Sequence, residues 1–97
     1  MIIWEDKILE SRLAINQYNS KSCTGRDKKR IHKLIESIKR DGLLNGIGKP
    51  ETLKHRTPTR YSRRVNGSDR LVYDVIYNDE TGKSTLRIYT YKFHYID

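Results

Sequence analysis

The chain has 97 residues, a formal net charge of +8 at pH 7 and a sequence pI near 9.7. This length fits one domain over residues 1–97, and the charge favours a polyanionic or acidic partner, with nucleic acid as the first candidate. The single Cys excludes an internal disulfide, the Cys and three His match no zinc pattern, and no apolar run could span a membrane, which together favour a soluble cytoplasmic protein without metal or cofactor.

The first half of the chain has the periodicity of helices. Residues 1–4 form a short apolar run that predicts a strand, and two acidic residues then suit the first turn of a helix over residues 5–18. A second helix is predicted from Thr24, which can cap it together with Asp27, as far as Gly42. Its apolar positions follow the i, i+3, i+4, i+7 spacing: Ile31, Leu34, Ile35 and Ile38.

Basic residues decorate this second helix. The ordinary interpretation of such a charge run is a solvated helix face. The functional interpretation is a non-specific contact surface for a nucleic-acid backbone. The residues that would form this surface are Lys28, Lys29, Arg30 and Lys33.

The second half of the chain alternates with a period of two, as strands do. Asn66–Gly67 predicts a tight hairpin turn, and residues 78–83 predict a longer one. One strand, two helices and then an antiparallel meander define an α+β fold, with the N-terminal strand and both helices packed on one face of the sheet. The strands of the meander are predicted at residues 51–53, 60–65, 70–77 and 84–95.

Residues 48–73 concentrate positive charge around one acid. This window carries only two carboxylates, Glu51 and Asp69, against seven basic residues. Clustered cations with one carboxylate suit a phosphodiester, because the cations hold the phosphate while the carboxylate moves a proton. From composition alone, a structural counter-ion is the commoner role for Glu51. The basic residues are Lys49, Lys54, Arg56, Arg60, Arg63, Arg64 and Arg70.

Four blocks in register resemble the YoeB toxins of the Txe/YoeB family, within the RelE-like superfamily of toxin–antitoxin systems. They are GKPETLKH (48–55), YSRR (61–64), DRLVY (69–73) and FHY (93–95). The resemblance implies a RelE-like fold and a ribosome-dependent, metal-independent endoribonuclease that cuts mRNA in the A site. It also implies a YefM-like antitoxin with an acidic C-terminal segment, and a homodimer.

The resemblance assigns a role to each residue that matches the family's catalytic set. Glu51 matches the general base, Arg70 the cation that stabilises the transition state, and His94 an acid that works once a substrate phosphate lies beside it. Tyr95 would stack on a base or donate to a phosphate. The residues that would hold flanking phosphates or ribosomal RNA are Lys54 and Arg64, followed by Lys49, Arg60 and Arg63.

Two departures from the family pattern flank these positions. Thr52 stands where a Pro is common after the Glu, and Lys92–Phe93 replaces the usual Arg–Tyr before His94. Two other functions stay open at this point. A basic α+β domain could block RNA or the ribosome without cutting, and a superfamily relative could act on another target such as DNA gyrase.

Overall fold

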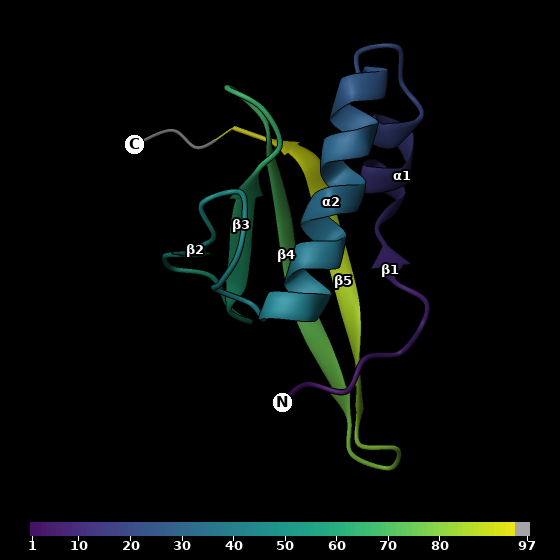
Figure 1. Ribbon diagram of the computed structural model, residues 1–97, viewed down its shortest axis with the longest axis vertical. Helices are drawn as coiled ribbons and strands as arrows, with labels where there is room; N and C mark the ends of the chain where they lie inside the picture. The colour runs from purple at the N-terminus through teal and green to yellow at the C-terminus, as the bar shows by residue number, and fades with distance from the viewer. Residues whose placement is uncertain (95–97) are drawn as a thin grey trace.

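The computed structural model describes residues 1–94 and shows two helices on a five-stranded sheet (Figure 1). The sheet order is β1-β5-β4-β3-β2, with β1 parallel to β5 at one edge and the other neighbours antiparallel. Both helices lie on the same face of the sheet, which confirms the predicted α+β fold. The elements are β1 (Leu9–Glu10), α1 (Arg12–Tyr18), α2 (Gly25–Asp41), β2 (Glu51–Leu53), β3 (Arg60–Arg64), β4 (Arg70–Asn78) and β5 (Lys83–Phe93).

The first eighteen residues differ from the prediction. Residues 1–4 contribute only an isolated bridge at Trp4, and the helix predicted over residues 5–18 begins at Arg12, after its cap Ser11. The reason is the free edge of β5, whose backbone groups bond this segment: Ser84 N–H donates to the Ile3 carbonyl, and Glu5 N–H donates to the Ser84 carbonyl. Backbone pairing with a distant strand thus outweighs the local apolar spacing.

The second helix forms as predicted. Thr24 accepts a hydrogen bond from the Asp27 N–H, and the Asp27 carboxylate accepts one from the Thr24 N–H, which completes a capping box. Gly42, with φ of 101°, ends the helix. The buried face of α2 packs on the sheet, with a core formed mainly by Ile31, Leu34, Ile38, Leu71, Tyr73, Leu86 and Ile88.

The turn between β3 and β4 is not the tight hairpin predicted from Asn66–Gly67. The last pair of the two strands is Arg64 with Arg70, so five residues connect them. Asn66 organises this loop, because its side-chain oxygen accepts hydrogen bonds from the backbone N–H groups of Ser68 and Asp69. The side-chain turn replaces the positive-φ turn that an Asn-Gly pair usually forms.

Arg63, which is predicted to contact RNA, lies instead in the protein interior. Its side chain is fully buried and faces α2, because strand alternation points its neighbours Ser62 and Arg64 to the opposite face. Every guanidinium N–H has an acceptor at 2.6–3.0 Å. The five acceptors are the hydroxyls of Tyr73 and Ser37 and the carbonyls of Gly42, Asn45 and Ile47.

These bonds fix the connection between α2 and β2. Three of the five acceptors are carbonyls of residues 42–47, and Tyr73 donates a further hydrogen bond to the Leu43 carbonyl. The same connection passes so close to α2 at Gly48 that a Cβ there would lie 2.6 Å from Leu34 Cδ2. The position at which β2 begins is therefore set by Arg63 and by Gly48.

Within residues 1–94, neither helix is long and apolar enough to cross a membrane.

We expect Arg63→Lys to lower the free energy of unfolding by about 3 kcal/mol, because an ammonium has three donors for five acceptors and leaves at least two polar groups buried and unpaired. Urea unfolding measures the effect, with the exposed neighbour Arg64→Lys as the matched control. Equal stability of the two variants would contradict the role of Arg63.

Candidate active site

Three of the residues with predicted catalytic roles lie on the sheet face that the helices leave uncovered. The register pairs Glu51 with Ser62, Arg64 with Arg70, and Arg70 with Phe93. Paired residues, and residues two apart on a strand, point to the same face. Glu51, Arg64 and Arg70 therefore share this face, although they come from three different strands.

Glu51 and Arg70 are joined by an ion pair between Glu51 Oε1 and Arg70 Nη1. The carboxylate is about half exposed, whereas the Arg70 side chain is 17% exposed. The sequence left open whether Glu51 is a structural counter-ion or a functional carboxylate. In the structure it is a counter-ion of Arg70 and is also exposed to an incoming ligand. A guanidinium beside it offers a phosphate a planar pair of donors.

His94 lies close to Asp69, the residue that directly precedes β4 and that has no role predicted from the sequence. His94 Nε2 is 3.4 Å from Asp69 Oδ1, and Lys92 Nζ is 3.6 Å from Asp69 Oδ2. Asp69 is buried and directly precedes Arg70, so it links the position of His94 to that of Arg70. In the sequence, Asp69 is marked by its place in the DRLVY block and as one of only two carboxylates in residues 48–73. Tyr95, the other terminal residue with a predicted role, lies outside the described residues.

The remaining predicted contacts differ in how they are presented. Lys49 and Lys54 are exposed on either side of β2, and Arg64 is exposed at the end of β3. Arg60 begins β3 on the same open face, with its guanidinium carbon 3.8 Å from the centre of the Tyr89 ring. Arg60 and Arg64 thus lie on the face that carries Glu51 and Arg70, and Lys49 and Lys54 are exposed at the two ends of β2.

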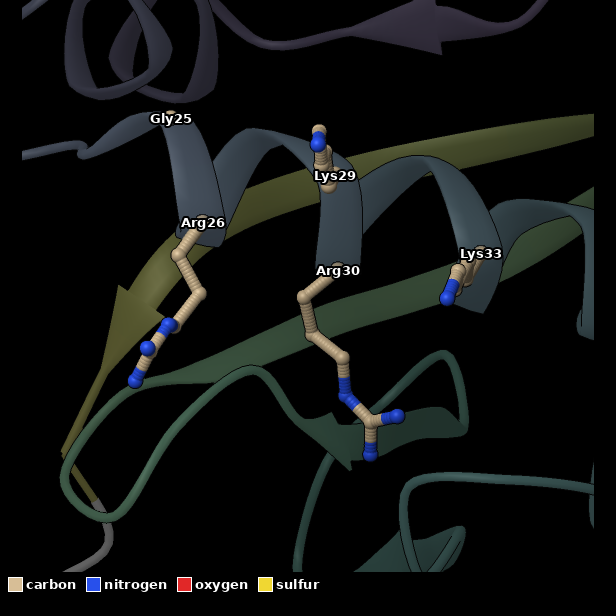
Figure 2. Close-up of a pocket in the computed structure, with 5 residues that line it drawn as sticks. All are labelled: Gly25, Arg26, Lys29, Arg30 and Lys33. Atoms are coloured by element: carbon tan, nitrogen blue, oxygen red, sulfur yellow. The ribbon is translucent and has the colours of Figure 1, made fainter.

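Four of the basic residues of α2 form a separate surface (Figure 2), here called the α2 strip. They line a shallow hollow of about 510 Å³ together with Gly25. The side chains of Arg26 and Arg30 extend from the same side of the helix. Lys28, also predicted to bind RNA, instead lies over the Tyr18 ring at 5.1 Å and does not line the hollow. The α2 strip consists of Arg26, which the sequence analysis did not select, with Lys29, Arg30 and Lys33.

A hydrogen-bond chain joins α2 to the loop that precedes Arg70. The Asn66 side-chain amide donates to Asp27 Oδ1 and to Asp69 Oδ2. This bond from Asn66 is the main reason that the pKa of Asp27 is lowered from its ordinary value, with the Thr24 backbone bond adding to it.

Within residues 1–94, no three His, Cys, Asp or Glu residues lie close enough together to hold a metal ion.

The fold and this face define a small, basic protein of the RelE-like α+β class. A family model described as the YoeB-like toxin of bacterial type II toxin–antitoxin systems matches residues 13–95, and the chain belongs to this family.

Individual relatives agree with this assignment. Toxin YoeB of Synechocystis sp. is 45% identical over 67 residues, which cover 69% of this chain and 70% of the relative. The YoeB dimer from Staphylococcus aureus is 38% identical, covers 92% of this chain and 97% of its own, and superposes with a TM-score of 0.78. The YoeB–YefM complex from the same organism matches with the same identity and coverage and a TM-score of 0.73.

The lowered pKa of Asp27 predicts how stability depends on pH. A carboxylate with a depressed pKa in the folded state stabilises the protein above its unfolded pKa and loses this effect as pH falls through the folded value. We therefore expect the difference in unfolding free energy between the wild type and Asp27→Asn to be largest near pH 6 and to shrink as the pH falls below about 4.

Urea unfolding at a series of pH values measures this difference. Asn66→Ala, which removes the main donor to Asp27 but leaves the Thr24 bonds, should weaken this pH dependence in part. A difference that stays constant over the whole range would mean that the Asp27 charge does not stabilise this junction.

Proposed function

We propose that the chain is a toxin that enters the ribosomal A site and cleaves mRNA there without a metal ion. The observation that carries the proposal is the ion pair of Glu51 with Arg70 on an open, cation-rich face. Membership of the YoeB-like toxin family supports it. The ribosomal setting comes from the family resemblance of the residues around this pair.

The proposed reaction begins when an RNA phosphate binds Arg70 and competes with Glu51 for its guanidinium. The released carboxylate takes the proton of the adjacent 2′-OH, and the 2′-oxygen attacks the phosphorus. Arg70 stabilises the additional negative charge on the phosphorane. The bond to the 5′-oxygen then breaks, and His94 donates a proton to that leaving oxygen. The products are a 2′,3′-cyclic phosphate and a 5′-hydroxyl, and DNA is not cut because it lacks the 2′-OH.

Other basic residues would hold the RNA around this centre. Lys49, Lys54 and Arg64 surround β2 and the end of β3, where they can reach flanking phosphates. Tyr95 is proposed to stack on a base. The α2 strip, which has no carboxylate among its lining residues, would contact ribosomal RNA as a second and sequence-independent surface.

The relatives suggest two protein partners. Because a similar toxin from Staphylococcus aureus forms a complex with YefM, we propose that this chain binds a YefM-like antitoxin whose acidic C-terminal segment covers the open face. Because a similar toxin is a dimer, we also propose a homodimer of single-domain chains. A cytoplasmic location follows from the proposed ribosomal target.

The first test is primer extension on an mRNA translated in a purified system. We expect the wild type to give a discrete cut at the A-site codon that requires ribosomes. Glu51→Gln and Arg70→Ala should slow cleavage by roughly 10²- to 10⁴-fold, because each removes a group that acts in the transition state. Glu80→Gln, an exposed acid in the turn between β4 and β5, is the matched control.

The same assay separates the enzyme from a protein that only blocks translation. If translation stops while the mRNA stays intact, and both site variants inhibit as well as the wild type, the catalytic proposal is wrong. Loss of cleavage in the variants with retained ribosome binding supports it.

The α2 strip predicts a strong effect of salt on ribosome binding. Each phosphate contact lowers the slope of log K against log salt by about 0.7–0.9, so Lys29→Gln with Lys33→Gln should make this slope shallower by roughly 1.5. A salt series of binding constants measures it. Two exposed lysines elsewhere, Lys7→Gln with Lys83→Gln, provide the control, and an equal change in both double variants would exclude a special role for the strip.

A further inference from the structure

The open face carries a second constellation of side chains that the proposed reaction does not use. Asp74 is buried, and it accepts two hydrogen bonds of 2.7 Å from Arg87 and one of 2.8 Å from the Tyr89 hydroxyl. The pKa of Tyr89 is raised, first by burial and then by this bond, so the phenol keeps its proton as donor at neutral pH. The ring of Tyr89 is therefore held in one orientation by a charged network in the sheet.

Arg60 lies on this fixed ring. Its guanidinium carbon is 3.8 Å from the ring centre, a distance at which the cation is in contact with the aromatic face. Arg60 Nε is buried without a hydrogen-bond partner within the described residues, so it is turned into the protein and away from any phosphate outside. The side chain is only half-buried, which leaves part of its surface open to a ligand. Arg60 and Tyr89 are called the Arg60–Tyr89 shelf below.

The shelf lies next to the proposed catalytic pair. Arg60 pairs with Leu53 across the β2–β3 ladder, and Glu51 pairs with Ser62 in the same ladder. Arg60 is thus two residues along β3 from the position opposite Glu51, which is roughly 7 Å on the same face. The Arg70 guanidinium reaches Glu51 through their ion pair, so the base of a nucleotide whose phosphate is bound there can extend to Arg60.

We propose that the Arg60–Tyr89 shelf binds the nucleobase adjacent to the scissile phosphate by stacking on the Arg60 guanidinium. A guanidinium plane is an established surface for unstacked RNA bases, and the aromatic ring beneath it holds this plane in place before RNA arrives. The inference rests on the proposed function. It adds to that function a residue that positions the nucleotide by its base, whereas Lys54 and Arg64 act on phosphates.

The test uses Arg60→Lys, which keeps the positive charge and removes the plane. Single-turnover cleavage on programmed ribosomes should fall about tenfold in kcat/KM, as expected for the loss of one base stack. The control is Arg12→Lys, at an exposed position of α1, which should cleave like the wild type.

A second arm replaces each nucleotide of the A-site codon in turn by an abasic one. If the base stacks on Arg60, one of these mRNAs is cleaved at the same rate by the wild type and by Arg60→Lys, because the contact is already absent. Wild-type rates in Arg60→Lys on intact mRNA indicate a plain charge contact with phosphate and overturn the proposal. A deficit that persists on every abasic mRNA also overturns it, because the lost contact is then not with a base.

The outcome for the shelf can be separated from that for the enzyme. A wild-type protein that does not cleave on ribosomes refutes the proposed function, and stacking is then read from 2-aminopurine placed in the A-site codon. Quenching of its fluorescence by the wild type but not by Arg60→Lys supports the shelf, and equal quenching by both refutes it.

Discussion

The geometry of the open face depends on one buried guanidinium on the other side of the sheet. Arg63 uses all five of its N–H donors, three of them on the carbonyls of the connection from α2 to β2. No carboxylate accepts from it directly among the described residues, although Ser37 links it to Asp41. Carbonyl dipoles therefore solvate most of this charge, and removing any of them leaves a buried charge short of partners.

This arrangement explains how a three-residue edge strand can carry a functional carboxylate. β2 is short and pairs only with β3, so it has little backbone pairing of its own. Hydrogen bonds to the preceding connection fix the residue at which β2 begins. Arg63 donates to three carbonyls of residues 42–47, and the Arg64 N–H donates to the Gly48 carbonyl at 2.7 Å. Strand alternation lets β3 serve both purposes, because Arg63 anchors the loop while its neighbours face the site.

The parts of the structure that the sequence predicts are those decided locally. The capped, periodic α2 and the alternating strands follow from spacing, and the match of Glu51 and Arg70 to a known motif predicts that they meet. Arg63 and Arg64 are the same residue type side by side, so charge and hydropathy do not show which one is buried. The late start of α1 does not follow from local spacing, because hydrogen bonds to the distant strand β5 decide it. The Asn66 loop differs from the predicted turn because the Asn66 side chain accepts from the N–H groups of Ser68 and Asp69, which the Asn-Gly pair alone does not indicate.

The distribution of charge on this face also bears on how such a toxin would be inhibited. Arg63 is fully buried, and the Arg87 guanidinium is paired with Asp74, so neither attracts a polyanion strongly. Arg64 and the lysines around β2, in contrast, remain open to solvent. On the proposed function, RNA and an acidic antitoxin segment would both be drawn to these open cations. Inhibition then requires no change of conformation in the toxin, because two polyanions that bind one face exclude each other, and the tighter one determines whether Glu51 is accessible.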